Sequence, residues 1–340
     1  MTKFYMIIMF SMLIISTLIS ISSYSWMGMW LGLEINILSI IPIMINQKNK
    51  ISSESAIKYF ITQTIASTSI MLSITIMMKQ FNFSENLIKE LPTLIMNSGF
   101  LMKMGMAPFH FWFPEVLEGL SWNNSIIMLT WQKITPMVML MFNIEKSLFF
   151  IIVIIISMVI SSLMAINQIS LRKILTYSSI NHMGWMLSSM LLSQSIWLMY
   201  FIIYTITTIN IAMIFNLTNT FFVSQLSLMW NFNPKIKLFF LINFLSFVGI
   251  PPFIGFFPKW LTIQILISSN LFFMSILMIF MTLIMIYVYL MLMIPSTMMN
   301  TTYSKWNMLN TFKYNKMMSL MNFFIITGMI ISTILINYKE

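Results

Sequence analysis

Four ionisable side chains lie inside segments that are otherwise apolar enough to cross a lipid bilayer: Glu34, Lys103, Lys133 and Lys259. Placing one charge at the depth of the bilayer costs about 2.5 to 3.5 kcal/mol on insertion scales, so charges there have to be paired, hydrated or neutralised. Helix packing does not require such groups, whereas carboxylates and amines can take up and release protons. Their placement therefore favours a path for protons or small cations through the interior of a membrane protein.

Each of these residues also has a purely structural interpretation. Glu34 is either a carboxyl group that burial keeps neutral or the partner of a cation. Lys133 either donates hydrogen bonds to carbonyl groups near Pro136 or carries a proton, which suits lysine because its amine can exist buried in the neutral form. Lys259 follows Pro258 at the start of a half-helix, where the positive helix end disfavours a charged amine unless carbonyl groups of the preceding half offset it.

The two histidines are ambiguous. His182 lies in the middle of an apolar span and is either a proton carrier that connects other groups or a buried histidine with satisfied hydrogen bonds. His110 follows Pro108 by two residues, so we expect it mainly to cap an interruption of the helix and only secondarily to carry protons. Lys58 is expected to extend toward the surface from the first turns of its helix. The charges near other span ends are interpreted as interface or loop charges: Glu115, Glu118, Arg172 and Lys173.

The composition defines the surroundings of these residues. Of 340 residues, 59% are hydrophobic and 8% are charged, and the mean hydropathy is +0.90, whereas soluble domains carry about 25% charged residues. The chain is therefore an integral membrane protein. It has no cysteine, so it cannot hold thiolate-bound iron–sulfur clusters or zinc by itself, and we expect redox chemistry in partner chains. Its formal charge of +10 is spread between apolar spans, unlike the surface of a nucleic-acid-binding protein.

Stretches of about 20 apolar residues predict an all-α membrane bundle of about eleven transmembrane helices. They lie near residues 4–24, 26–45, 55–78, 92–118, 123–142, 147–167, 172–192, 195–220, 236–268, 270–294 and 318–338. The fourth and ninth contain internal prolines, Pro108 in one and Pro251, Pro252 and Pro258 in the other. Because proline removes a backbone donor, each is predicted to be two half-helices joined by irregular backbone, which a membrane interior tolerates only against protein or water.

The chain is predicted to form one membrane domain over residues 1–340, because no linker is long enough to divide it. The two broken spans lie five helices apart and share a lysine, glycine, internal proline and clustered aromatic residues, at 99–115 and 246–260. An odd offset reverses the direction of crossing, as in inverted repeats, whose binding sites lie at broken helices. We therefore expect two five-helix repeats, near 4–142 and 147–294, followed by a C-terminal helix near 318–338.

The loop charges predict the orientation, because basic residues are retained on the side from which a chain inserts. If the helices alternate, the side of the N-terminus holds ten basic residues: Lys3, Lys48, Lys50, Arg172, Lys173, Lys235, Lys237, Lys305, Lys313 and Lys316. The other side holds four: Lys79, Lys89, Lys146 and Lys339. The N-terminus is therefore predicted on the inserting side and the C-terminus on the opposite side.

Five runs of residues resemble one protein family: 32–42 (GLEINILSIIP), 103–120 (KMGMAPFHFWFPEVLEGL), 130–136 (TWQKITP), 170–186 (SLRKILTYSSINHMGWM) and 249–260 (GIPPFIGFFPKW). In the same order and nearly from end to end, they resemble the subunit 2 family of the mitochondrial NADH dehydrogenase, respiratory complex I, in an arthropod-like version. This antiporter-like family is similar to subunits of cation/proton antiporters. The resemblance implies a location in the mitochondrial inner membrane, with the N-terminus toward the matrix and the C-terminus toward the intermembrane space.

The resemblance also implies a function and a set of partners. It implies a proton-translocating subunit of a hetero-oligomeric NADH:ubiquinone reductase, beside other membrane-arm subunits and inner-membrane lipids. Flavin, iron–sulfur clusters and quinone would be held by partner subunits, with no cofactor in this chain. Lys103 would pair with Glu34, and Lys259 would be the outer lysine of a path that enters from the matrix and passes Lys103 and Lys133. Two alternatives stay open: a membrane-arm subunit that conducts nothing, and a stand-alone cation/proton antiporter.

Overall fold

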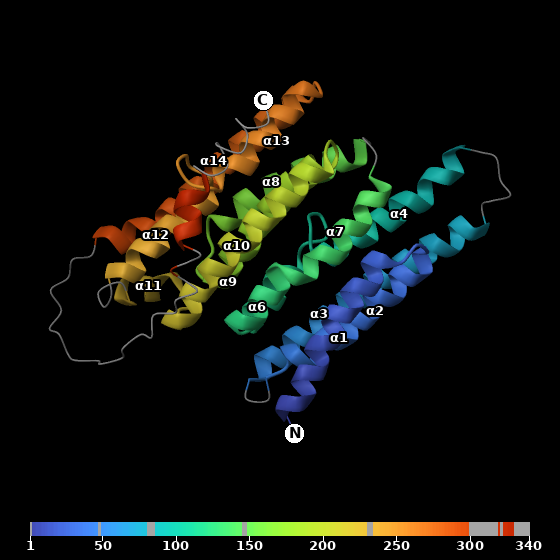
Figure 1. Cartoon of the computed structure of the whole chain (residues 1–340), viewed down its shortest axis with the longest axis horizontal. Coiled ribbons are helices and arrows are strands. Elements are labelled where there is room, and N and C mark those ends of the chain that lie inside the picture. Colours follow the sequence, from blue (N-terminus) through green and yellow to red (C-terminus); the bar gives the residue numbers. More distant parts are fainter. Residues whose placement is uncertain are drawn as a thin grey trace. The chain divides into compact units, whose positions relative to one another are not determined.

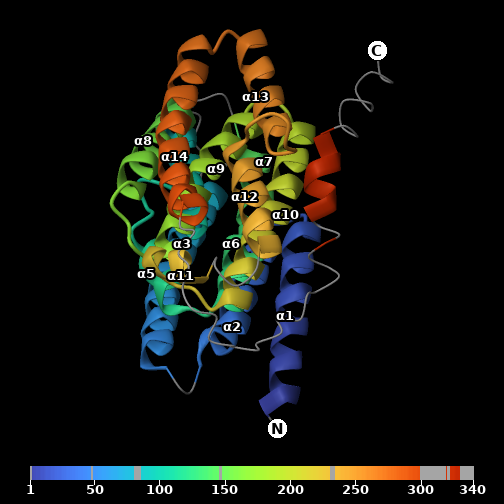
Figure 2. The same ribbon diagram turned by 90° about the vertical axis from the view of Figure 1, so that its left-hand side faces the viewer.

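The computed structural model describes residues 2–46, 49–79, 86–144, 148–229, 234–298, 319 and 322–329. In this part of the chain every regular element is a helix, apart from one isolated β-bridge between Ser170 and Phe222. The predicted all-α class is thus confirmed. The chain divides into two compact units, Met1–Lys146 and Ser147–Glu340, whose helices are drawn in Figure 1 and, turned by 90°, in Figure 2.

The first unit consists of helices that pack mostly on their neighbours in sequence. They are α1 (Thr2–Ser22), α2 (Trp26–Met44), α3 (Lys50–Lys79), α4 (Asn86–Met104), α5 (Trp112–Gly119), α6 (Trp122–Leu129) and α7 (Trp131–Asn143). α1 packs against α2, α2 against α3, and α3 against both α4 and α5, while α7 packs against α1 and α4. α1 and α2 approach so closely that a Cβ atom on Gly32 would lie 2.7 Å from the Cβ atom of Ser20, so only glycine fits there.

The second unit has α9 at its centre. Its helices are α8 (Leu148–Ala165), α9 (Leu171–Met190), α10 (Gln194–Thr218), α11 (Val223–Met229), α12 (Pro234–Val248), α13 (Phe256–Ser268) and α14 (Phe272–Met298), and residues 322–329 are also helical. α9 packs against α8, α10, α13 and α14, and every residue from Ile174 to Leu191 is buried. α10 packs against α12 and α13, and α14 against α8 and α12.

Seven helices in the described part of the chain are long and apolar enough to cross a membrane: Phe4–Ser22, Trp26–Met44, Lys50–Met78, Trp122–Asn143, Leu148–Ala165, Gln194–Thr218 and Phe272–Ile294. Each coincides with a predicted span, although α3 begins at Lys50 instead of near residue 55. α9 is not among these seven. The short helix α11 was not predicted, and most of the span predicted near 318–338 lies outside the described residues.

The first predicted interruption lies between α4 and α5. α4 ends in a Schellman motif, in which the Gly105 N–H donates to the Met102 carbonyl over 3.1 Å and the Met106 N–H to the Leu101 carbonyl over 3.1 Å. Gly105 has a φ of 69°, a left-handed conformation that favours glycine. Pro108 follows, so the helix does not resume until Trp112.

The second predicted interruption lies between α12 and α13. The Gly249 N–H donates to the Ser246 carbonyl over 3.0 Å and the Ile250 N–H to the Leu245 carbonyl over 3.2 Å, and Gly249 has a φ of 81°. A Cβ atom on Gly255 would lie 1.7 Å from the carbonyl oxygen of Ser246. The start of α13 therefore touches the end of α12 backbone to backbone, which only glycine allows.

The span Trp122–Asn143, predicted over 123–142, is bent at Thr130. α6 ends at Leu129, α7 begins at Trp131, and Thr130 between them has φ −116° and ψ −69°. The Thr130 hydroxyl donates to the Ile126 carbonyl over 2.7 Å, and this carbonyl also accepts the Thr130 N–H over 3.0 Å. Threonine bonds of this kind bend helices. Lys133 is consequently the third residue of α7, just after the bend in the middle of the span Trp122–Asn143.

Candidate functional site

Lys103 is a buried amine at the end of α4. Its side chain lies in the last turn before the first interruption and is 7% exposed. Within the described part of the chain, Lys103 Nζ has no hydrogen-bond partner. A charged ammonium group in an apolar interior is strongly destabilised without a partner, so this amine is either neutral or hydrated.

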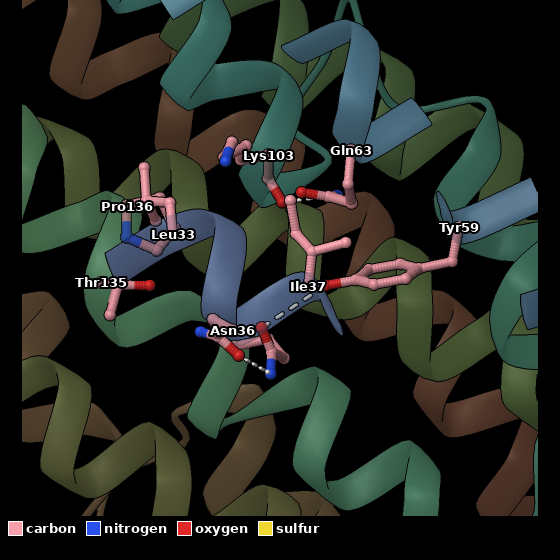
Figure 3. Close-up of a pocket in the computed structure, with 9 residues that line it drawn as sticks. Leu33, Asn36, Ile37, Tyr59, Gln63, Lys103, Thr135 and Pro136 are labelled. Atoms are coloured by element: carbon pink, nitrogen blue, oxygen red, sulfur yellow. Dashed lines mark hydrogen bonds between the residues drawn. The ribbon is translucent and has the colours of Figure 1, made fainter. Parts of the chain in front are cut away.

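Lys103 lines a cavity of about 10 Å³, which is roughly the space of a single water molecule. The cavity is bounded by residues of α2, α3, α4 and α7, drawn in Figure 3: Leu33, Asn36, Ile37, Tyr59, Gln63, Lys103, Gln132, Thr135 and Pro136. Most of these side chains carry an oxygen or nitrogen atom that can bond water. The amine of Lys103 therefore has a polar, water-sized space beside it.

Neutral polar side chains connect the helices around this cavity. The Gln132 amide donates to Asn36 Oδ1 over 2.8 Å, and the Tyr59 hydroxyl donates to Gln132 Oε1 over 3.4 Å, as the dashed lines in Figure 3 show. On the opposite wall the Gln63 amide donates to the Lys103 carbonyl over 3.3 Å. α2, α3, α4 and α7 are thus joined at the cavity by hydrogen bonds of uncharged groups.

Glu34 lies on α2, two residues before Asn36, and is partly exposed. It is close enough to Lys103 for the two charges to interact. However, the ion pairs within 4.0 Å among the described residues are those of Lys58, with Glu54 at 3.1 Å and with Glu115 at 2.9 Å. The structure therefore brings Glu34 and Lys103 near each other without direct contact.

Lys133 is 1% exposed and lies one residue beyond Gln132. Its Nζ is 5.3 Å from the centre of the Phe113 ring, a cation–π distance. Lys133 itself does not line the cavity, although its neighbour Gln132 does. Because α7 begins at Trp131, Lys133 lies in a first helical turn, where the positive helix end disfavours a charged amine.

Lys259 lies in the first turn of α13, and its Nζ donates to the carbonyl of Val248 over 2.7 Å. Val248 is the last residue of α12. The carbonyl end of the first half-helix therefore does reach the amine, and it offsets the positive end of α13. Lys259 spans the second interruption by this one hydrogen bond.

His182 is buried on α9 within the second unit. Its Nδ1 shares a hydrogen bond of 2.9 Å with the Tyr200 hydroxyl, and its ring packs on Phe247 (4.4 Å between centroids) and Tyr204 (5.3 Å). It lines a second cavity of about 10 Å³, together with Tyr200, Ile203, Tyr204, Thr207, Ser246, Phe247, Gly255 and Pro258. His182 and the interruption beside Lys259 thus share one cavity.

His110 is buried inside the first interruption. Its ring packs on Phe111 with 4.4 Å between centroids, and its side chain is hydrogen-bonded to the backbone of Pro108. Its carbonyl accepts the Phe113 N–H over 3.0 Å at the start of α5. These contacts fit the predicted capping role.

The structure adds neutral residues to the predicted set. Asn36, Tyr59 and Gln132 surround Lys103, and Tyr200 holds His182. Two of them had a local signal, because Gln132 adjoins Lys133 and Asn36 follows Glu34 within the same apolar helix. Within the described part of the chain, no three His, Asp or Glu side chains gather as a metal site would need.

Comparison with known proteins identifies the family of this chain. Residues 23–285 match the family described as "NADH:quinone oxidoreductase/Mrp antiporter, TM". The chain is 43% identical over 323 residues to NADH-ubiquinone oxidoreductase chain 2 of Anopheles gambiae, covering 94% of each chain. It is 43% identical over 331 residues to that of Aedes aegypti, covering 96% of this chain and 97% of the other.

Two solved structures share the fold. A chain of respiratory complex I from Thermus thermophilus with bound Aureothin superimposes with a TM-score of 0.79 at 21% identity, over 86% of this chain and 70% of the other. A chain of the Mrp complex from Dietzia sp. DQ12-45-1b gives a TM-score of 0.76 at 15% identity, over 83% of this chain and 58% of the other.

These matches define a membrane protein of the antiporter type, and the chain belongs to the NADH:quinone oxidoreductase/Mrp antiporter family. The relatives that match it along nearly its whole length are NADH-ubiquinone oxidoreductase chains 2, including those of insects. The resemblance of its five sequence motifs is therefore confirmed.

Proposed function

We propose that this chain is a proton-translocating membrane subunit of a NADH:ubiquinone reductase in the mitochondrial inner membrane. The observation that carries the proposal is the buried amine of Lys103, which has no hydrogen-bond partner in the described part of the chain and borders a water-sized polar cavity at a broken helix. Such an amine can bind a proton when water or a negative charge approaches and can release it when they withdraw. The family of the chain supports the same function.

The electron transfer that drives the movement belongs to partner subunits. Flavin, iron–sulfur clusters and quinone would lie there, since this chain has no cysteine to ligate a cluster. In this chain a proton would enter from the matrix and be stored on Lys103 and Lys133. Glu34, near Lys103, attracts the ammonium form and so controls storage. Release would pass Lys259, with His182 and His110 as secondary carriers.

We further propose eleven transmembrane helices arranged as two inverted repeats, near 4–142 and 147–294, and a C-terminal helix near 318–338, within one membrane domain. The packing within each unit supports the repeats. The helix pairs that pack together in the first unit recur in the same order in the second. In the first unit they are α1–α2, α2–α3, α3–α4, α3–α5, α4–α7 and α1–α7. In the second they are α8–α9, α9–α10, α10–α12, α10–α13, α12–α14 and α8–α14. The loop lysines support an N-terminus in the matrix and a C-terminus in the intermembrane space.

Replacing Lys259 with glutamine tests the relay. We expect the assembled complex with K259Q to move fewer protons for each NADH oxidised, because the last exchangeable group of the path is lost. The measurement is proton uptake against NADH oxidation in closed membrane vesicles. A non-conducting spacer instead predicts an unchanged ratio even when Glu34, Lys103, Lys133 and Lys259 are all neutralised. A stand-alone antiporter predicts ion exchange by the purified chain alone.

A further inference from the structure

We propose that Lys58 and Glu115, together with Glu54, form a second proton-exchange site, at the place in the first unit that corresponds to Lys259 in the second. This proposal rests on the proposed function and extends it to Lys58, which the sequence placed toward the surface, and to Glu115, which it indicated as an interface or loop charge.

The two interrupted helices have the same register. The separation in residue number is the same for the two helix ends and for the two helix starts. α4 ends at Met104 and α12 at Val248, while α5 begins at Trp112 and α13 at Phe256. Under this shift the segments 105–115 (GMAPFHFWFPE) and 249–259 (GIPPFIGFFPK) share their first glycine, one central proline, two phenylalanines and the last proline.

The backbones of the two segments are also hydrogen-bonded alike. Both begin with a Schellman motif around a glycine of positive φ, Gly105 in one and Gly249 in the other. Two later bonds recur at the same shift: Phe109 N–H to Met106 O (2.8 Å) with Phe253 N–H to Ile250 O (3.0 Å), and Phe113 N–H to His110 O (3.0 Å) with Phe257 N–H to Ile254 O (3.2 Å). The two interruptions are therefore one structural motif used twice.

This register changes which residues are equivalent. Lys103 corresponds to Phe247, so the two deep lysines of the broken helices do not occupy matching positions. The residue that matches Lys259 is Glu115, in the first turn of α5. Each unit therefore carries an ionisable group at the same point of the motif, an amine in one and a carboxylate in the other.

Glu115 is joined to α3 by an ion pair. Its Oε2 accepts from Lys58 Nζ over 2.9 Å, and Lys58 also contacts Glu54 Oε1 over 3.1 Å. The side chains of Lys58 and Glu115 are 42% and 58% exposed, in contrast to the buried Lys103. Three charges on a lipid-facing surface would be strongly disfavoured, so this face is expected to meet water or a polar surface of a neighbouring subunit.

A buried tyrosine connects this surface group with the cavity of Lys103. Tyr59 follows Lys58 on α3, and its ring lies 5.8 Å from that of Trp112, one helical turn before Glu115. The Tyr59 hydroxyl lines the cavity that Lys103 also lines, as Figure 3 shows. The residue next to Lys58 of the exposed ion pair therefore reaches the cavity of the buried amine.

The proposed step moves one proton from outside to Lys103. A proton from the aqueous phase binds the Glu115 carboxylate, which becomes neutral and releases Lys58. The proton then passes to the amine of Lys103 by way of water in the cavity. Glu115 is then a carboxylate again and pairs with Lys58. If the repeats are inverted, Glu115 and Lys259 lie toward opposite membrane faces, as uptake and release require.

The test compares variants in the assembled complex in closed vesicles. We expect E115Q to lower the number of protons moved per NADH oxidised by the same fraction as K259Q, with the amount of assembled complex measured separately. E118Q, on the same short helix, is the matched control and should leave the ratio at the wild-type value. K58Q/E115Q removes both charges of this pair and leaves only Glu54, 66% exposed, without its contact to Lys58, so it provides the same comparison if E115Q does not assemble.

Wild-type ratios in E115Q and K58Q/E115Q, beside a lowered ratio in K259Q, would overturn this site and leave the proposed function intact. A wild-type ratio in K259Q as well would instead overturn the proposed function. A loss of assembly with a wild-type ratio in the complexes that do assemble would make the ion pair a structural contact only, and would likewise overturn this site.

Discussion

Lys103 combines an amine, near-complete burial and, among the described residues, no hydrogen-bond partner. Two roles fit this combination: a fixed positive charge that holds Glu34 near, or a group whose proton comes and goes. Arginine separates them, because the guanidinium group stays protonated in proteins whereas a lysine amine can become neutral.

We expect Lys103→Arg to lower the number of protons moved per NADH oxidised although it keeps the positive charge. The measurement is proton uptake against NADH oxidation in closed vesicles. Lys50→Arg, at the exposed start of α3, is the control and should leave the ratio unchanged. A wild-type ratio in K103R would mean that Lys103 contributes its charge and not its proton.

Tyr200 positions His182 through the bond of 2.9 Å to Nδ1. Replacing Tyr200 with phenylalanine takes this partner from a buried ring nitrogen, and a lost bond of this kind costs about 1–3 kcal/mol of stability. We expect thermal denaturation of the assembled complex to release this subunit at a lower temperature in Y200F. Tyr287→Phe, on the half-exposed Tyr287 of α14, should leave that temperature unchanged. Equal temperatures in both variants would contradict the positioning role.

The charged members of the site could be predicted from the sequence because a charge within an apolar span is conspicuous. The neutral members were missed: Asn36 and Gln132 had only a local signal, as neighbours of Glu34 and Lys133, and Tyr59 had none. Asn36, Tyr59 and Gln132 belong to residue types that occur at many other positions, and only the packing of α2, α3 and α7 brings them to one cavity. The separation of Glu34 from Lys103 is likewise a matter of side-chain conformation, which periodicity does not determine.

At the scale of elements, the second interruption depends on direct backbone contact. A Cβ atom on Gly255 would overlap the carbonyl oxygen of Ser246, and no side chain can move to relieve the overlap. Overpacking costs typically about 1–3 kcal/mol, and a clash with backbone lies at the upper end. We expect Gly255→Ala to reduce the amount of assembled complex, measured by native electrophoresis of solubilised membranes.

The control for this substitution is Gly28→Ala, where the new atom would meet only the side chains of Ser23 and Ser25 at 3.0 Å or more. This variant should assemble nearly as the wild type does. Comparable amounts of complex in G255A and G28A would show that α12 and α13 can separate without harm.

The elements themselves were predictable to different degrees. Long apolar stretches located the membrane-crossing helices, and internal prolines located both interruptions of broken helices. The bend at Thr130 had no such marker, because it arises from one hydroxyl that bonds its own helix, and threonine occurs in unbroken helices as well. α11 was missed because its seven residues are too few for a periodic pattern.

At the scale of the whole molecule, composition alone was sufficient to assign the chain to the membrane. The equivalence of Glu115 and Lys259 could not be predicted from the sequence, because the lysine in each broken span suggested that Lys103 is the equivalent of Lys259. Backbone hydrogen bonds and helix ends were needed to fix the register.

The burial of α9 from Ile174 onward has a consequence for biogenesis. α9 is too polar to be counted among the helices that could enter a bilayer by themselves, yet α8, which precedes it and packs along it, is the most apolar of those helices. Partition of α9 into lipid as an isolated segment is therefore unfavourable. We expect the translocation machinery to hold α9 until α8 and α10 have been synthesised, so that these three segments leave it together.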